Sequence, residues 1–471
     1  MRSALGDDTS DSAQQFAMAS VSATSLDVVR LYAKTMAAQS ANRFDEALQS
    51  ASEAVKLDPK FGLGYLLQAV ASRNLGRTED NQKFLNQALS HLDGMTERER
   101  YQTRGYSYLI SGDFGQCVKE FTELIAKYPS DVAGRNQLAL CLSNQRQMSR
   151  AMDEIRQVVK ILPSHPLFRD NLALYSNYAG DFQGAEQEAR AVTGPDAYAS
   201  LALALAQTGQ GQIEQARATY QALGQIGALG ASMSASGLGD LAAYQGRYAD
   251  AVRVLRVGAT ADLAAKNTDG AAAKLVALAF AELSRGRSKE AIAAADEALA
   301  AAGTVKIEFL TGRIFIEAGA PERATPLAER LAKEFFVEPR AYAKQLQGLA
   351  ALKAGDARQA VTTLREANEL FSTWLGEFDL GRASLEAAAF TQADSAFDIC
   401  LNRRRGEALA LFVDEEPTYA YLPQVYYYQG LVREGLKSAG AAESFRQYVA
   451  IRGASPDDAL LKDARTRTGV R

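Results

Sequence analysis

A turn recurs along this chain at nearly constant spacing, and the recurrence limits the possible folds more than any other feature of the sequence. Glycine, or a residue in its place, recurs at intervals of about 34 residues. The turn positions are Asn42, Gly76, Gly112, Arg146, Gly180, Gly211, Gly246, Gly286, Gly319, Gly355 and Ala388. Such a period is the signature of an array of repeated structural units. The 471 residues are therefore predicted to form an elongated array rather than one ordinary core.

Small residues keep a fixed distance from these turns. Alanine or cysteine stands five residues after most of them, and alanine or glycine stands seven residues before most of them. Small side chains at both places let two antiparallel helices approach closely. Alanine, leucine, glutamine, glutamate and arginine dominate the composition and favour helix. We predict an all-α fold, an α-α superhelix of about twelve helix-turn-helix units.

The sequence Gly-Asp-Phe occurs twice, from Gly112 and from Gly180, and its meaning follows from the spacing. The two copies begin two of these intervals apart, with the turn at Arg146 halfway between them. A phosphate-binding loop would need a following Gly-Lys-Ser/Thr, which neither copy has. We therefore predict that each glycine ends a helix in the left-handed conformation and that Asp113 and Asp181 cap the next helix.

The same features resemble the tetratricopeptide repeat, whose pattern of about 34 residues runs from an aromatic residue through Leu-Gly, Tyr and Ala-x-x-x-Phe to Pro. One unit matches it with Tyr101, Gly105, Tyr108, Cys117, Phe121 and Pro129. The next unit matches it with Leu138, Ala139, Leu142, Ala151, Ile155 and Pro163. The resemblance covers residues ~26–450. It implies a superhelix whose concave wall is made by the first helix of each pair.

The regularity of the repeats divides the chain into four parts. We expect an irregular lead-in at 1–25 and a regular array of about six repeats at 26–225. An alanine-rich, less regular array follows at 226–405, and an insertion, a terminal helix pair and a polar tail fill 406–471. The stretch 224–237 is rich in Gly and Ser and suggests a joint or a flexible helix, and residues 259–270 hold an insertion. One rigid superhelix and two hinged ones are both compatible with this pattern.

Composition argues against catalysis, cofactors and nucleic-acid binding. The net charge is −4 and the pI about 5.6, whereas nucleic-acid binders usually carry a basic surplus. The two histidines, His91 and His165, are far apart in the sequence, and no protease, hydrolase or kinase motif occurs. Three scattered cysteines predict neither a disulfide framework nor a zinc site, so we expect each to pack as a small apolar residue. No apolar run approaches the ~20 residues that span a bilayer. We predict a non-enzymatic, soluble chain without a cofactor.

Two residue clusters late in the chain have alternative interpretations. The arginines at 403–405 suit a helix C-terminus, where cations are favoured, or form a basic docking patch. The tyrosines among residues 419–428 divide between core and rim, or form an exposed recognition surface. We favour the structural interpretation of each cluster.

If the chain does no chemistry, its function lies on its surface, and the predicted partner is a protein or peptide in the concave groove. Counting from each turn gives the inward positions of three consecutive repeats. They are Gln102, Tyr106, Leu109, Ile110, Asn136, Leu140, Asn144, Asp170, Leu174, Asn177 and Tyr178. Amides there can pair with a peptide backbone, and Tyr and Leu can anchor its side chains. The lysine–asparagine pair with which one tetratricopeptide subfamily binds chaperone tails is absent from the first-helix positions.

The stretch "MTERERYQTRGYSYLISGDFGQCVKEFTELIAKYP" resembles more particularly the repeat region that follows the kinase domain in some bacterial serine/threonine protein kinases. This resemblance implies an alternative function, the sensor or docking region of a signalling protein whose catalytic domain is not in this chain. We expect a cytoplasmic location by default. The alternative is the extracytoplasmic part of a membrane-anchored signalling protein.

Overall fold

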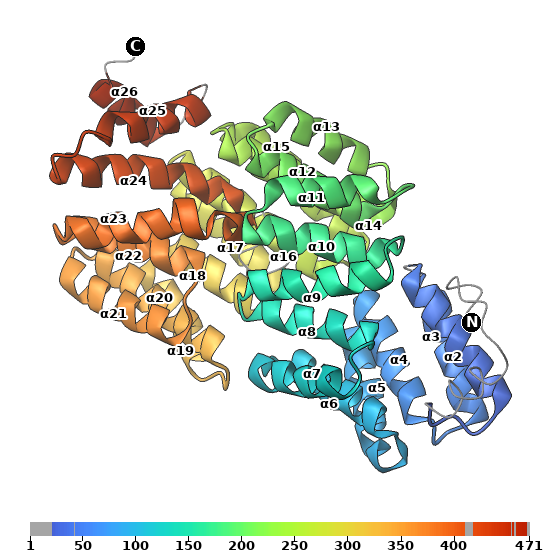
Figure 1. Ribbon diagram of the computed structural model, residues 1–471. Helices are drawn as coiled ribbons and strands as arrows, with labels where there is room; N and C mark the ends of the chain where they lie inside the picture. Colours follow the sequence, from blue (N-terminus) through green and yellow to red (C-terminus); the bar gives the residue numbers. More distant parts are fainter. Residues whose placement is uncertain (1–20, 42, 410–417, 454, 456–457, 469–471) are drawn as a thin grey trace. The chain divides into compact units, whose positions relative to one another are not determined.

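The computed structural model describes residues 21–41, 43–409, 418–453, 455 and 458–468, and 25 α-helices lie in this part of the chain (Figure 1). Twelve pairs of consecutive helices, each joined by a short turn, precede the last helix, α26 (Ala459–Thr468). The first helices of the pairs are α2 (Leu26–Ser40), α4 (Gly62–Asn74), α6 (Glu97–Ser111), α8 (Val132–Asn144), α10 (Pro166–Ala179), α12 (Ala197–Gly209), α14 (Gly227–Tyr244), α16 (Thr268–Ser284), α18 (Val305–Glu317), α20 (Val337–Lys353), α22 (Trp374–Glu386) and α24 (Leu422–Gly435). The second helices are α3 (Phe44–Leu57), α5 (Thr78–Ser90), α7 (Phe114–Lys127), α9 (Met148–Ile161), α11 (Phe182–Ala191), α13 (Ile213–Leu223), α15 (Tyr248–Ala264), α17 (Ser288–Ala301), α19 (Pro321–Ala332), α21 (Ala357–Leu370), α23 (Phe390–Asp398) and α25 (Ala441–Arg452). The predicted all-α array of helix pairs is confirmed.

The turns lie where the glycine series placed them. Ten of the eleven turn positions have a positive φ, which includes Arg146 at 61° and Ala388 at 56°, and the eleventh, Asn42, lies outside the described residues. A left-handed residue ends a helix at least cost when it is glycine, and this explains why glycine fills most of these positions. Asp113 and Asp181 cap the following helices as predicted, because their carboxylates accept from the amides of Gln116 and Gly184.

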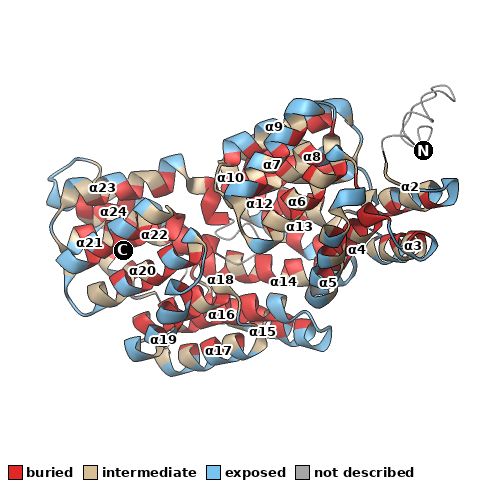
Figure 2. Cartoon of the chain, turned by 90° about the horizontal axis from the view of Figure 1, so that it is seen from below, coloured by how far each residue is buried: buried red, intermediate tan, exposed pale blue. Residues whose placement is uncertain are grey.

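The paired helices pack closely because small residues face bulky ones. A Cβ atom added to Gly105 on α6 would lie 2.6 Å from the Phe121 ring on α7. A Cβ atom added to Gly381 on α22 would likewise lie 2.5 Å from the Phe397 ring on α23. Figure 2 shows the buried residues gathered where helices face one another. The core of each repeat is therefore the seam between its two helices and the neighbouring pair.

The chain divides into two compact units, residues 1–175 and 176–471, and the division falls inside α10. Within the first unit, α2 contacts α4, α4 contacts α6, and α6 contacts α8. Within the second unit, each first helix from α12 to α24 contacts the next first helix. We call each of these rows a first-helix wall.

The irregular stretches of the sequence are accommodated inside helices. The longest interval between turns, from Gly246 to Gly286, is taken up by α15 and α16, which have 17 residues each. The stretch 224–237 lies mostly in α14, a continuous helix of 18 residues.

Among the described residues, no helix is both long and apolar enough to span a membrane.

The prediction that no cysteine forms a disulfide is wrong for one pair. Cys117 on α7 and Cys141 on α8 form a disulfide, and their Cα atoms are 6.0 Å apart. Both are fully buried, and Cys400 is a buried free thiol. Cys117 takes the small-residue position of its second helix, which packs against the first helix of the next repeat, where Cys141 lies. The repeat geometry, rather than the number of cysteines, brings the two sulfurs together.

Candidate binding surfaces

The predicted groove residues lie on three consecutive first helices, α6, α8 and α10. Six of them are buried: Tyr106, Leu109, Asp170, Leu174, Asn177 and Tyr178. Five are half-buried: Gln102, Ile110, Asn136, Leu140 and Asn144. A partner-binding role stays a prediction for all eleven, and the half-buried five present most of the surface that a partner could reach.

Tyr106 is tied to the interior of the first unit. Its hydroxyl accepts a 2.7 Å hydrogen bond from Asn81 Nδ2 on α5, and the same amide donates to the carbonyl of Ala69 at 2.8 Å. Burial raises the pKa of Tyr106 to about 12. Asn81 stands five residues after Gly76, where most repeats carry alanine or cysteine. A polar residue at a position that is small in most repeats is therefore the feature of the sequence that could have predicted the hydrogen bond between Asn81 and Tyr106.

A polar stripe on α8 remains accessible in the first unit. Asn136 accepts a 2.7 Å hydrogen bond from Asn171 Nδ2 on α10, so this side of α8 faces the next first helix. Asn136, Leu140 and Asn144 are spaced by four residues and therefore share one helix face. Asn144 also donates from Nδ2 to the carbonyl of Leu140 at 2.8 Å. These three half-buried side chains form a surface of two amides around one apolar anchor.

In the second unit, the first-helix wall is partly covered by the chain itself. The covering residues are Arg404–Leu409 and Thr418–Tyr421, which we call the inserted segment; residues 410–417 lie outside the described part of the chain. The inserted segment follows a short π-helix (η3, Ile399–Arg403) and contains two 3₁₀ turns, η4 (Arg405–Leu409) and η5 (Tyr419–Tyr421).

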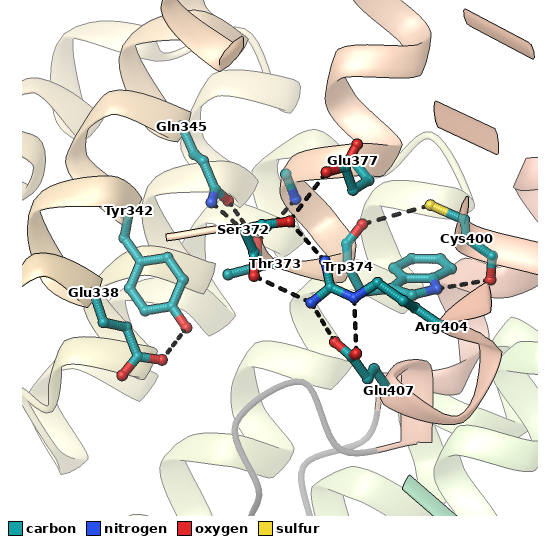
Figure 3. Close-up of polar contacts among 11 residues, drawn as sticks. Glu338, Tyr342, Gln345, Ser372, Thr373, Trp374, Glu377, Cys400, Arg404 and Glu407 are labelled. Carbon is teal, nitrogen blue, oxygen red and sulfur yellow. Dashed lines mark hydrogen bonds and ion pairs between the residues drawn. The ribbon is translucent and has the colours of Figure 1, made fainter. Parts of the chain in front are cut away.

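Arg404 fixes the beginning of the inserted segment at the N-terminus of α22 (Figure 3). Its guanidinium donates to Ser372 Oγ at 2.7 Å and to the Ser372 carbonyl at 3.1 Å, and it pairs with Glu407 at 2.5 Å. Ser372 in turn donates to Glu377 at 3.0 Å, and burial raises the pKa of Glu377. Of the three arginines, Arg403 ends the π-helix, in keeping with the structural interpretation of this cluster, and Arg404 is held in internal contacts.

The middle of the inserted segment packs on the backbone of α10. A Cβ atom added to Gly406 would lie 2.3 Å from the carbonyl oxygen of Asn177 and 2.6 Å from that of Tyr178. It would also lie 2.5 Å from the amide nitrogen of Gly180. Only glycine permits this approach, so the second Gly-Asp-Phe turn also forms part of the seat for the inserted segment.

Asp240 on α14 binds the end of the inserted segment. Its two carboxylate oxygens accept from consecutive backbone amides, Tyr419 N at 3.1 Å and Ala420 N at 3.0 Å. From α25, Arg452 Nη2 donates to the carbonyl of Ala420 at 2.9 Å. Asp240 is half-buried as a residue, and desolvation of its carboxyl group raises its pKa to about 7 against the opposing effect of the two amides.

The tyrosines at 419–428 mostly pack internally, as the favoured interpretation expected. The Tyr419 ring stacks on Tyr244 of α14 with centroids 5.1 Å apart, and the Tyr421 ring lies 4.4 Å from that of Phe280 on α16. Tyr419, Tyr421 and Tyr427 are buried, whereas Tyr426 and Tyr428 are half-buried.

A cluster of charged residues lies on the first helices α18, α20 and α22. Arg313 forms two hydrogen bonds with Asp379, both residues being buried. Arg382 pairs with Glu317 at 2.7 Å, and Lys353 lies 3.5 Å from the same carboxylate. Burial by itself would raise the pKa of Glu317, but the charges of Arg382 and Lys353 lower it to about 2. Glu317 is therefore ionised at neutral pH, and the charged side chains of this cluster pair with one another.

Two cavities of about 190 and 240 Å³ lie along this part of the wall. Both are lined by Glu317, Arg382 and Tyr428. Phe280, Arg313, Leu349 and Arg382, which line one or both cavities, stand six residues before a turn, and Ser284, Glu317, Lys353 and Glu386 stand two before. These are the positions of Tyr106 and Ile110 relative to Gly112. Counting back from each turn gave the predicted groove residues in three repeats. Counting back in the same way from the later turns would have selected these cavity-lining residues of the second unit.

Among the described residues, Cys400 is buried and both histidines lie against aromatic rings. Burial raises the pKa of the Cys400 thiol well above its usual value, so the thiolate nucleophile is disfavoured. Both histidines pack against aromatic rings: His91 stacks on Tyr65 with ring centroids 5.4 Å apart, and the His165 ring lies tilted against Phe168 with centroids 4.5 Å apart. Across the described ranges, no three His, Cys, Asp or Glu residues gather as metal ligands would.

Comparison with known proteins gives one family match. The tetratricopeptide repeat family matches residues 198–226, which contain α12 and α13 apart from the first residue of α12. No curated protein matches the chain. Among solved structures, yeast Tom70 is similar with 15% identity over 82% of this chain and 92% of that chain, at a TM-score of 0.44. The human IFIT1 dimer with m7Gppp-AAAA shares 13% identity over 82% of this chain and 89% of that chain, at a TM-score of 0.43. A tetratricopeptide repeat protein from Parabacteroides merdae shares 12% identity over 61% of this chain and 98% of that chain, at a TM-score of 0.34.

The matched segment is one helix pair of an array in which the same pairing and the same turn recur. Tetratricopeptide arrays are typically non-catalytic interaction scaffolds. The chain therefore contains one helix pair that matches the tetratricopeptide repeat family, within an array of twelve helix pairs.

Proposed function

We propose that this chain is a non-enzymatic scaffold that binds a protein or peptide partner along its first-helix walls. One observation carries the proposal: side chains at fixed distances before successive turns line the same two cavities in the second unit. Those positions hold aromatic, basic, acidic and apolar residues in different repeats. A wall whose side chains change from repeat to repeat supplies the mixed contacts that recognise a particular partner.

The first unit offers the wall with the better partner chemistry, because the inserted segment covers part of the wall in the second. On α8, Asn136 and Asn144 can bind a partner's backbone, and Leu140 between them can bury against an apolar side chain. We therefore place the contact on α8, with Gln102 and Ile110 on α6 beside it.

Site-specific photocrosslinking tests this placement. A photocrosslinking amino acid replaces Asn144 in one variant and the exposed Glu123 on the second helix α7 in a control variant, both expressed in the source cells. The proposal expects one discrete crosslinked protein from position 144 and none from position 123. Leu140→Glu, introduced beside the crosslinker, should abolish that product while circular dichroism stays unchanged. Equal products from both positions would contradict the wall as the binding surface.

The Cys117–Cys141 disulfide favours the extracytoplasmic location among the two expectations, because disulfides persist in oxidising compartments. We propose on this ground that the chain functions outside the cytoplasm, which also suits the sensor or docking region of a signalling kinase. Alkylation of free thiols in intact source cells, followed by mass analysis, should label Cys400 alone after denaturation. Labelling of all three cysteines would refute this location, and the size of the native product on an immunoblot tests the kinase alternative.

A further inference from the structure

The inserted segment contacts the wall of the second unit as a bound peptide would. Its backbone lies directly on the end of α10 at Gly406, and two of its consecutive amides bind one carboxylate at Asp240. Its Tyr419 ring stacks on Tyr244 of α14, and its Tyr421 ring lies tilted against Phe280 of α16. Backbone hydrogen bonds combined with seats for alternate side chains are the usual means of holding an extended segment.

Asp240 belongs to the wall rather than to the inserted segment. It stands six residues before Gly246, the same place that Arg313 and Arg382 take before their own turns. Asp240 therefore binds the two amides from a position that lines the wall in other repeats. Because it contacts backbone amides, this contact does not depend on the sequence of the bound segment. The sequence preference of the seat comes from the two aromatic contacts.

Among the ionisable groups around Asp240 and the two residues it binds, Asp240 is the one whose pKa lies near neutral. Tyr220 on α13 and Tyr419 on η5 are tyrosines whose pKa values are raised by burial. Arg405 on η4 donates to the Tyr419 hydroxyl at 3.2 Å, and Arg452 on α25 keeps a pKa of about 10 after burial has lowered it. The pKa of Asp240 itself is about 7.

We propose that the first-helix wall of the second unit is a docking groove for an extended segment bearing two aromatic rings, that the chain's own inserted segment occupies it, and that ionisation of Asp240 loosens this occupant. The inference does not depend on the partner proposed for the first unit. It is measured on the isolated chain, so a failed crosslink at position 144 leaves it standing.

The direction of the pH effect follows from the linkage of proton binding to docking. When the inserted segment is released, Asp240 faces water and has an ordinary pKa of roughly 4. Between that value and about 7 the docked carboxyl keeps a proton that the released one has lost. Docking therefore weakens as the pH rises through this window, by at most about tenfold per pH unit, and levels off above it.

Hydrogen exchange on the full chain tests this directly. The protection of the amides of residues 418–421 is followed from pH 5 to pH 8, corrected for intrinsic exchange, with the α18 amides as an internal reference. We expect the protection of these four amides to fall by up to about tenfold per pH unit between pH 5 and 7. In Asp240→Asn, which keeps an acceptor oxygen without a charge, the pH dependence should disappear. A flat profile in the natural chain, or an unchanged slope in the variant, would overturn the proposal.

A binding measurement tests the docking groove independently of pH. The chain carrying Tyr419→Ser and Tyr421→Ser, which we call the emptied chain, loses the two ring contacts that hold its own segment in the groove. The probe is a labelled peptide of the sequence Thr-Tyr-Ala-Tyr-Leu-Pro-Gln, residues 418–424. Binding to the emptied chain, but not to the natural chain or by a peptide with both tyrosines replaced by serine, supports the groove. Absence of binding by an emptied chain that retains its helical circular dichroism overturns it. If that variant does not fold, the exchange experiment decides alone.

Discussion

Asp379→Asn removes the carboxylate that neutralises a buried arginine, and its cost measures how far this part of the wall is shielded from water. The exposed side-chain fractions of Arg313 and Asp379 are 4% and 0%. Breaking a buried pair by removing one partner costs about 3–5 kcal/mol, since the remaining charge stays desolvated. A second arginine, Arg382, lies 3.4 Å from the same carboxylate and also loses an ionic neighbour. We therefore expect a loss of about 3–5 kcal/mol in the free energy of unfolding of the second unit.

The single tryptophan of the chain makes this loss measurable. Trp374 begins α22, the helix that carries Asp379, and is buried with its indole N–H donating to the carbonyl of Cys400 at 3.0 Å (Figure 3). Its fluorescence in a urea titration follows the second unit even if the chain unfolds in more than one step.

Two controls complete this experiment. Glu366→Gln breaks the exposed pair with Lys344 on the neighbouring helices and should cost under about 1 kcal/mol. The double variant Arg313→Met with Asp379→Leu replaces both charges by apolar groups and should recover most of the lost stability. A cost below about 1 kcal/mol for Asp379→Asn would refute the reasoning, because it would mean that water solvates the pair.

Three further changes test the packing and electrostatics of the fold. Replacing Cys117 and Cys141 together by alanine should lower the free energy of unfolding by ~3 kcal/mol, and reductant should lower the melting temperature of the natural chain but not of this variant. Gly105→Ala places a methyl group 2.6 Å from an aromatic ring and should cost about 1–3 kcal/mol in thermal unfolding. Gly94→Ala, where nothing lies within 4 Å of the new methyl group, should be close to neutral. Glu317, with its pKa lowered to about 2, stabilises the fold above pH ~4.5 and loses this contribution as the pH falls towards 2, so Glu317→Gln should flatten acid unfolding monitored by circular dichroism.

The repeated architecture could be predicted from the sequence because its determinants are local. A helix that ends in a left-handed residue selects glycine at that residue, and this selection is visible in the sequence at most turns, as at Gly112 and Gly180. The close approach of paired helices selects small residues at fixed distances from the turn, as at Gly105. The capping aspartates act within three residues of themselves. The same phase predicts which side of α6, α8 and α10 carries the groove residues, and a partner-binding role for that side stays a prediction.

The contents of the wall were decided only by the tertiary structure, since they join residues far apart in the chain. Arg313 and Asp379 are 66 residues apart, and Asp240 binds amides 179 and 180 residues away. The residues next to Arg313, Asp379 or Asp240 in the sequence do not show which distant residue each will contact, because each one alone predicts only a charged side chain on a helix. The disulfide likewise joins two cysteines that the sequence presents as small core residues. The periodicity of the sequence therefore predicts the helices and the turns between them. Long-range packing decides which side chains come into contact, and it also places the inserted segment on the first-helix wall of the second unit.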